Sequence, residues 1–283
     1  MKQTRKQITA DINETTTLKD LMASYEEIAA VRMQRIREQV LKSRDFHQIL
    51  SHYFHEIRTS QSLFADKPAK KLEPKQTTPL VVLFSDSKGL YGDILHRTTV
   101  AFIEYAREHS DAKLVVIGTL DEEHLKEALP ARDLTFFPVP QITDSIENIA
   151  ELTSLLSSYQ EVTVFHGKFI SLINQEPQAS QITGIEEEQT ESEGLVKAYL
   201  LEPSQEQLKE FFQKEIITLL FDQAILEGTL AKVASRVTSL EKATSEASRR
   251  LKRLERLSRM VASEKQNKEQ ITYLAGLSLW KIQ

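Results

Sequence analysis

The chain contains no cysteine, and its eight prolines and eight glycines are unevenly distributed over 283 residues. The absence of cysteine excludes a disulfide, a thiol nucleophile and a cysteine-ligated metal. No proline occurs in residues 1–67 or in residues 204–283. Because an interior proline breaks a helix by removing a hydrogen bond and clashing with the preceding turn, both ends are free to form long helices. The simplest layout is a long antiparallel helical pair with a folded domain between its arms.

Long apolar runs are also missing. No stretch approaches the roughly 20 residues that a membrane-spanning helix needs, and the basic residues 1–7 are not followed by the apolar segment of a signal peptide. A net charge of -5 argues against a polycation that binds nucleic acid, and a hydrophobic content of 40% is enough for a core. We therefore expect a soluble protein, or one held at a membrane only through a partner.

The C-terminal arm, residues 204–283, carries a regular hydrophobic pattern. Apolar or small residues alternate at spacings of 4 and 3, at Leu226, Leu230, Val233, Val237, Leu240, Thr244, Ala247, Leu251, Leu254, Ser258 and Val261. This pattern predicts the buried seam of a coiled coil. A helix of about 70 residues would extend on the order of 100 Å, far longer than a globular core of this size requires.

The N-terminal arm, residues 1–64, predicts a helix from about residue 3 to about residue 62. Its apolar residues form two runs with a change of phase between them, at Leu18, Leu21, Tyr25 and Ile28, then Met33, Ile36 and Val40, then Phe46, Leu50, Tyr53 and Ile57. This pattern predicts a coiled-coil seam with a discontinuity. The polar segment 13–17 is a candidate to cap or interrupt the helix.

After a linker at 65–78, the central residues 79–203 alternate short apolar runs with helical stretches. Strands are predicted at 80–84, 114–118, 134–137 and 162–165, helices at 93–109, 121–129 and 143–158, and a closing pair of strands near 181–183 and 196–201. This alternation predicts a mainly parallel sheet covered on both faces. The fold class is therefore α/β, with a long antiparallel coiled coil of N- and C-terminal helices and an inserted Rossmann-like α/β domain.

Few residues are candidates for catalysis or for binding a nucleotide or a metal. The segment 85–92 follows a strand and precedes a helix, where a nucleotide phosphate could sit, but its spacing favours a tight turn with two glycines. His52 and His55 could share a helix face as metal ligands, but without a carboxylate–histidine framework, solvated or interfacial histidines are favoured. No serine or aspartate pattern stands out as a nucleophile site. We predict no catalytic residue, no cofactor and no metal.

Two basic bands are present on the predicted helices. They comprise Arg32, Arg35 and Arg37 on the first arm, and Arg249, Arg250, Lys252, Arg253, Arg256 and Arg259 on the second. The ordinary interpretation is a solvated helix face, and nucleic acid is disfavoured because no aromatic residues are interleaved. An acidic protein partner is the better functional interpretation. The contact candidates are Arg32, Arg35, Arg253, Arg256 and Arg259.

Three segments carry a resemblance to the gamma subunit family of F-type ATP synthase. Residues 85–92 are similar to its Ser-Asp-x-Gly-Leu-Cys-Gly turn, with one extra residue before Gly89, and residues 28–35 resemble Val-Ala-Ala-Ala-Lys-Leu-Arg-Arg. Residues 234–247 are similar to Ala-Ala-Arg-Met-x-Ala-Met-x-x-Ala-Thr-x-Asn-Ala. The chain departs from the family pattern at Glu26, which replaces a lysine, and at Met260, which replaces a glutamine. It is therefore identified as a divergent member.

The resemblance implies the central rotor shaft of the synthase. The helical pair would turn inside a hexamer of alpha and beta subunits, and the inserted domain would lie beside the epsilon subunit and the c-ring. The chain would then be a non-catalytic subunit, peripheral to the cytoplasmic face of a bacterial-type cell membrane. Two alternatives remain open: a coiled-coil adaptor or scaffold protein with an inserted α/β domain, and a Rossmann-type enzyme with helical dimerisation arms.

Overall fold

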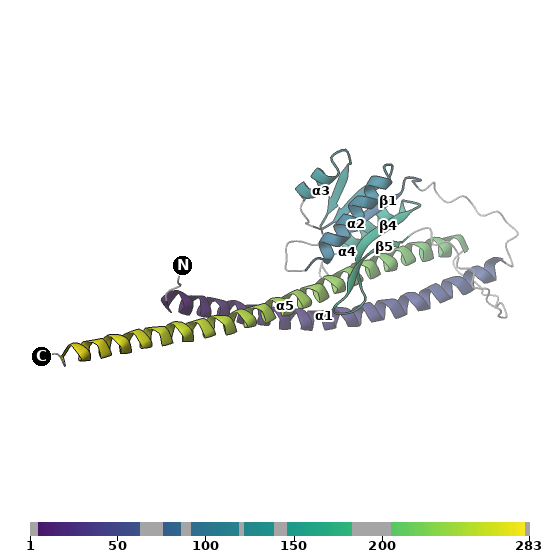
Figure 1. Ribbon diagram of the computed structural model, residues 1–283. Helices are drawn as coiled ribbons and strands as arrows, with labels where there is room; N and C mark the ends of the chain where they lie inside the picture. The colour runs from purple at the N-terminus through teal and green to yellow at the C-terminus, as the bar shows by residue number, and fades with distance from the viewer. Residues whose placement is uncertain are drawn as a thin grey trace. The chain divides into compact units, whose positions relative to one another are not determined.

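The computed structural model describes residues 5–62, 76–85, 92–118, 122–138, 146–182 and 205–280. They fall into two compact units. One unit combines the residues up to Ala30 with those from Val237 onward, and the other runs from Val31 to Arg236. The two long helices, α1 (Arg5–Ser62) and α5 (Gln205–Trp280), each contribute a segment to both units (Figure 1).

A five-stranded sheet forms the centre of the Val31–Arg236 unit. Its strands are β1 (Leu80–Phe84), β2 (Lys113–Ile117), β3 (Leu134–Phe137), β4 (Val162–Phe169) and β5 (Gln175–Gln181). Their order is β3-β2-β1-β4-β5; the first four are parallel, and β5 is antiparallel to β4. The predicted mainly parallel sheet is confirmed. The closing strand predicted near 181–183 lies earlier in the chain, since β5 ends at Gln181, and its partner is β4. The predicted strand 196–201 lies outside the described residues.

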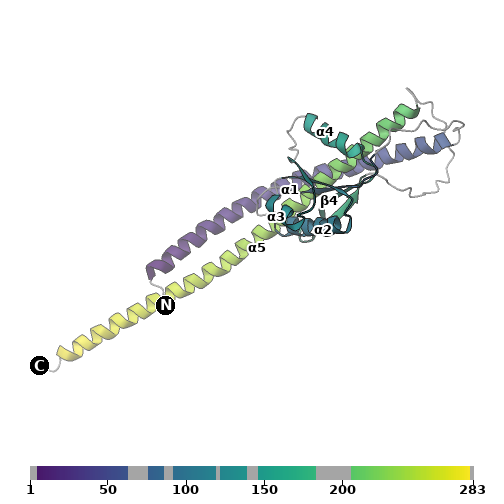
Figure 2. The same ribbon diagram turned by 90° about the horizontal axis from the view of Figure 1, so that it is seen from above.

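Helices cover both faces of this sheet, as the sequence predicts. The shorter ones are α2 (Ile94–Glu108), α3 (Glu122–Ala128) and α4 (Ile146–Ser157). Alternate residues of β1 enter two separate hydrophobic clusters, because successive side chains of a strand point to opposite faces. Val81 packs in the cluster that contains Phe102 of α2 and Leu125 of α3. Figure 2 shows α2 and α3 on one side of the sheet and α4 on the other.

The long C-terminal helix takes part in the core of the sheet domain. Val82 of β1 lies in one hydrophobic cluster with Leu156 of α4 and with Ile217, Phe221 and Ala224 of α5. These α5 residues are at most 5% exposed. Burial of such side chains is worth about 1.5–3 kcal/mol each for the larger ones, so this part of α5 is held firmly against the sheet.

Helix α1 runs without a break from Arg5 to Ser62, so the predicted interruption near Thr15 is wrong. The hydroxyls of Thr16 and Thr17 donate to the carbonyl oxygens of Ile12 and Asn13, at 2.8 and 3.0 Å. A hydroxyl that bonds to the carbonyl oxygen of the preceding turn is compatible with a continuous helix.

The face of α1 that is buried differs from the predicted one. Leu18, Leu21, Tyr25 and Ile28 are between 43% and 64% exposed. A continuous series of buried or half-buried positions instead comprises Ile8, Ile12, Thr15, Lys19, Met22, Glu26, Ala29, Met33, Ile36, Val40, Ser43, His47 and Leu50. They alternate at spacings of 4 and 3 with no discontinuity. The prediction followed the largest apolar side chains, whereas this seam includes polar residues that a search for hydrophobic periodicity passes over.

In the later part of α1, the structure describes only some of the side chains of the predicted seam. Phe46, a member of the predicted seam, is half exposed, while Leu50 is half-buried. The side chains of Tyr53 and Ile57 lie outside what the structure describes. Met33, Ile36 and Val40, which the sequence placed out of phase, are in phase with the observed seam.

The predicted seam of α5 is confirmed as a buried stripe. Its positions from Leu226 to Val261 are all buried or half-buried, whereas Arg249 and Arg250 between them are exposed. From residue 263 to residue 275 every side chain is exposed. Among the described side chains of α5, burial therefore ends near Ala262.

Candidate functional site

The five arginines predicted to contact partners are all exposed on the long helices. Arg32 and Arg35 belong to the Val31–Arg236 unit, and Arg253, Arg256 and Arg259 belong to the other unit. The guanidinium of Arg259 lies 4.0 Å from the carboxylate of Glu255 one turn earlier on α5, and both side chains are more than half exposed. Solvated pairs of this kind contribute about 0–1 kcal/mol, so these cations can exchange partners at low cost.

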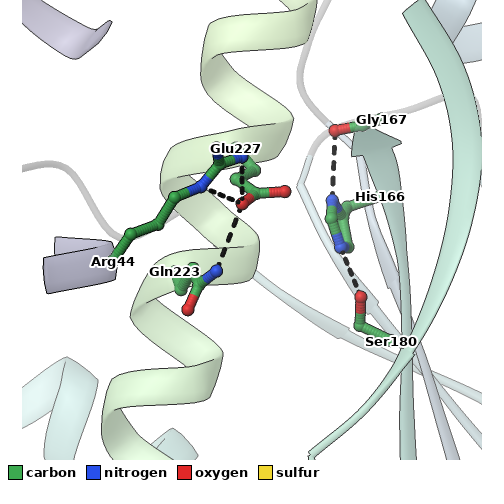
Figure 3. Close-up of polar contacts among 6 residues, drawn as sticks. All are labelled: Arg44, His166, Gly167, Ser180, Gln223 and Glu227. Carbon is green, nitrogen blue, oxygen red and sulfur yellow. Dashed lines mark hydrogen bonds and ion pairs between the residues drawn. The ribbon is translucent and has the colours of Figure 1, made fainter. Parts of the chain in front are cut away.

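A partly buried polar cluster, which no sequence pattern singled out, joins α1 to α5 in the Val31–Arg236 unit (Figure 3). Glu227 is 7% exposed, and its Oε1 accepts hydrogen bonds from Nε and Nη2 of Arg44 at 3.0 and 2.7 Å. Gln223, one turn earlier on α5, donates to the same oxygen at 3.2 Å. Only a contact across 183 residues of sequence reveals this cluster, since a lone glutamate beside the apolar seam gives no signal of its own.

His166 of β4 is a second buried polar group, 1% exposed (Figure 3). Its Nδ1 donates to the carbonyl oxygen of Gly167 at 3.1 Å, and its Nε2 therefore accepts from the hydroxyl of Ser180 at 2.8 Å. Both bonds are complete with a neutral ring. Burial lowers the pKa of His166, an effect that the hydrogen bond to Gly167 and then the charge of Glu227 partly oppose. His166 is thus a neutral structural residue at ordinary pH rather than an exposed acid or base.

The remaining sequence candidates are only partly described. Of the turn 85–92, residues 86–91 lie outside the described residues; Ser85 is buried, and Gly92 has a φ of 64°, which glycine adopts readily. The side chain of His52 is exposed, whereas that of His55 is not described. Within the described ranges, no three histidine or carboxylate side chains gather as a metal site, and no helix is both long and apolar enough to cross a bilayer.

Fold and surface together define a mixed α/β sheet domain carried by two long terminal helices with exposed basic faces. A family model described as ATP synthase matches residues 4–271 of the chain. The match spans α1, the sheet domain and α5 as far as residue 271. The chain therefore belongs to the ATP synthase family.

Curated relatives agree with this family and are distant in sequence. The ATP synthase gamma chain of Anaeromyxobacter sp. is 25% identical over 247 residues, which cover 83% of this chain and 85% of the relative. The ATP synthase gamma chain of Pelagibacter ubique is 22% identical over 240 residues, covering 78% and 80%. The resemblance to gamma subunits is thereby confirmed at the level of the family and its named relatives.

Solved structures with the same fold come from ATP synthase stalks. The central stalk and c-ring structure of the Tetrahymena thermophila mitochondrial ATP synthase contains a chain with a TM-score of 0.55 and 16% identity, covering 79% of this chain and 99% of that one. A chain of the Euglena gracilis mitochondrial ATP synthase, OSCP/F1/c-ring in rotational state 3, has a TM-score of 0.51 and 11% identity, covering 88% and 94%. At sequence identities this low, the similarity shows that this chain shares its fold with those chains.

Proposed function

We propose that this chain is the central rotor shaft, the gamma subunit, of an F-type ATP synthase. In this role it couples transmembrane ion flow to ATP synthesis or hydrolysis in an alpha/beta hexamer by rotating within it. The observation that carries the proposal is the family match over residues 4–271, which includes α1, the sheet domain and most of α5. The gamma-chain relatives align over about four-fifths of their own length as well.

The shaft itself is an antiparallel coiled coil of α1 and α5 within one molecule. Two observations support this. Residues buried or half-buried at spacings of 4 and 3 run along both helices, the pattern of helices that wind around each other. In the Val31–Arg236 unit, Arg44 of α1 also bonds directly to Glu227 of α5. A stiff pair of this kind can transmit torque because close-packed interiors deform little under load.

The outer surface of the helices suits a shaft that turns inside a sleeve. On α1 an exposed apolar stripe is formed by Leu18, Leu21, Tyr25 and Ile28, and both helices carry exposed arginines, including Arg253 and Arg256 on α5. Contacts made by exposed charges are worth about 0–1 kcal/mol each. Many weak contacts with acidic loops of the alpha and beta subunits would hold the shaft centred and still let each contact exchange during rotation.

The sheet domain serves as the foot of the rotor, beside the epsilon subunit and the c-ring. The chain is attached to the membrane through these partners, peripherally and on the cytoplasmic face. It supplies no catalytic residue: the nucleotide sites belong to the hexamer, and the asymmetric shaft changes the conformation of each site in turn. The phosphoryl chemistry is therefore performed by the partner subunits, while this chain transmits mechanical work.

The test is purification of the tagged, full-length chain from its own organism under mild conditions. We expect alpha and beta subunits to accompany it in equal amounts, each in molar excess over the tagged chain. A matched variant with Leu18 and Leu21 changed to serine should fold normally, because both side chains are half exposed, and should recover less alpha and beta. Recovery of a homodimer without either partner would favour an adaptor, and a nucleotide bound by the purified chain alone would favour an enzyme.

A further inference from the structure

Two glycines lie where α5 meets the sheet, and a Cβ at either position would crowd its neighbours. A Cβ on Gly228 of α5 would lie 2.9 Å from Cδ1 of Phe84 and 3.3 Å from Cβ of His166. Phe84 ends β1 and is 3% exposed, and His166 on β4 is 1% exposed. The edge of the Phe84 ring thus rests against the bare backbone of α5. Because both neighbours are buried, neither can move aside without disturbing the core.

The second glycine repeats this arrangement from the side of the sheet. A Cβ on Gly167 of β4 would lie 3.0 Å from Cβ of Ala231 on α5 and 3.0 Å from Cγ1 of Ile94 on α2. Ala231 and Ile94 are at most 1% exposed. Gly228 therefore leaves a notch in the surface of α5 that receives the Phe84 ring. Gly167 leaves a notch in the sheet that receives Ala231 of α5.

The Phe84 ring has a further contact with the same helix. Nζ of Lys232, one turn after Gly228, lies 4.7 Å from the centroid of the ring, and Lys232 is 3% exposed. A cation is attracted to the negative face of an aromatic ring, and the attraction is stronger where water is excluded, as it is here. Phe84 is thereby fixed to two successive turns of α5, which resists both a shift along the helix and a rotation around it.

We propose that Gly228 and Gly167 are positioning residues that lock the sheet domain onto α5 and let torque pass between them without slipping. This inference rests on the proposed rotor function. Smooth apolar packing can slide through changes of rotamer, whereas a ring seated in a notch cannot leave it without opening the core. The sheet domain and the part of α5 that packs against it then rotate as one body.

The lock can be measured as the torsional stiffness between the domain and the shaft in the assembled complex with the alpha and beta subunits. Since the chain has no cysteine, a Glu123→Cys substitution on exposed α3 gives a single attachment point for a rotation probe. Gly228→Ala overfills the notch, and Phe84→Leu leaves it partly empty. Each should widen the angular fluctuations of the paused rotor by about twofold, since a mismatched core shifts backbone and rotamers. ATP hydrolysis by the hexamer should continue in both.

The double variant Gly228→Ala with Phe84→Leu is the decisive comparison. The flexible leucine can turn away from the new methyl group and refill the notch, so the stiffness should return toward that of the unsubstituted chain. Residues in direct contact show this kind of non-additivity, whereas independent sites add. Gly167→Ala is the corresponding change from the side of the sheet and should widen the fluctuations in the same way.

Two controls separate the lock from general stability. Val116→Ala removes core volume in the cluster that contains no described α5 residue, so it should lower stability and leave the stiffness unchanged. A probe at Gln48→Cys on the exposed face of α1 should report no change in any variant. The proposed lock would be contradicted if the angular fluctuations were unchanged in Phe84→Leu and Gly228→Ala, or if Val116→Ala widened them equally. Absence of rotation in the unsubstituted complex would instead overturn the proposed function.

Discussion

The guanidinium of Arg44 on α1 and the carboxylate of Glu227 on α5 lie in direct contact, with Nη2 2.7 Å from Oε1. The Glu227 side chain is 9% exposed, and the Arg44 side chain is 41% exposed. The carboxylate is thus largely removed from water and depends on Arg44 and Gln223 for its hydrogen bonds. This contact holds the first arm of the chain beside the last arm at one defined level of the two helices.

Removing the cation from this pair should destabilise the protein. Arg44→Met leaves the carboxylate of Glu227 buried with one fewer partner, at a cost of about 1–3 kcal/mol. Arg44→Met with Glu227→Met should recover most of this loss, since an apolar pair avoids the burial of charge. Urea unfolding of the purified chain measures both variants. Arg37→Met, an exposed arginine on the same helix, is the control; an equal loss there would contradict the assignment.

The observed burial of α1 predicts opposite outcomes for two similar substitutions. Ile36 is 4% exposed, so Ile36→Ser should cost about 2–5 kcal/mol through lost packing and a buried hydroxyl. Leu21 is 52% exposed, so Leu21→Ser should change stability by no more than about 0.5 kcal/mol. Urea unfolding of the isolated chain distinguishes them. If Leu21→Ser were the more damaging of the two, the seam on α1 would have to be reassigned to the exposed stripe.

Asp222 on α5 should limit stability at neutral pH. Burial, and then the nearby carboxylate of Glu215, raises the pKa of Asp222 above its ordinary value of 3.8. The folded state therefore favours the protonated form, so this group's contribution to stability is complete below pH 3.8 and is lost as the pH rises through the raised pKa. Asp222→Asn should be more stable than the unsubstituted chain at about pH 7.

This gain should disappear in acid, and thermal unfolding at a series of pH values measures it. Asp20→Asn removes an exposed carboxylate and is the matched control. A variant Asp222→Asn that is equally or less stable at neutral pH would show that the carboxylate has a favourable partner in the folded chain.

The contribution of His166 to stability should depend on pH in the opposite direction. Burial lowers the pKa of His166 below its ordinary value of 6.5, so the neutral ring is favoured in the folded state. Its contribution to stability is present above pH 6.5 and is lost as the pH falls from there through the lowered pKa. His166→Asn should therefore reduce the loss of stability in acid. Burial lowers the pKa of His47 too, so part of the pH dependence of stability should remain in this variant. His124→Asn, an exposed control, should leave the slope unchanged.

The hydroxyl of Ser180 provides an independent check of the proton on His166. Because Nδ1 donates to the carbonyl oxygen of Gly167, Nε2 can only accept from Ser180 in the neutral ring. Ser180→Ala should cost about 1 kcal/mol, the worth of one hydrogen bond. The nitrogen-15 chemical shifts of the ring identify the protonated nitrogen directly. A proton on Nε2 of the neutral ring would contradict this assignment.

The exposed arginines of α5 should govern the association of the chain with the alpha and beta subunits. Reversing Arg253, Arg256 and Arg259 to glutamate should weaken binding and reduce its dependence on salt, because screened surface charges act mainly on association. Quantitative pull-down at several salt concentrations measures this. The control reverses three other exposed cations, Lys242, Lys265 and Lys268. Equal weakening by both triple variants would show that the net charge of the chain, and not the position of the three arginines, determines binding.

Much of the architecture follows from local patterns in the sequence. The strands at 80–84 and 134–137 match β1 and β3, because continuous apolar runs between helical stretches signal buried parallel strands. The predicted seam of α5 agrees with the structure at every position, because its residues are almost all apolar or small. The predicted domain boundaries, the supercoiling of the helices and the contact arginines stay predictions.

The candidate sites were harder to predict, because each depends on residues distant in sequence. Glu227 had no local signal, and its importance comes from Arg44 on the other arm. Gly228 could be recognised as unusual within a helix, yet only its approach to Phe84 explains why glycine stands there. On α1, Thr15 is buried and Ile28 is exposed, the reverse of what their hydrophobicity suggests.

By itself the sequence determined the two long helices, the parallel strands between them and the family. These follow from the positions of proline, from apolar periodicity and from short matching segments, all of which act locally along the chain. The tertiary structure alone decided which face of α1 is buried, where the two arms bond to each other and how α5 fits against the sheet. The physical reason is that burial and close contact depend on what a distant element places opposite a residue, and no local pattern records that.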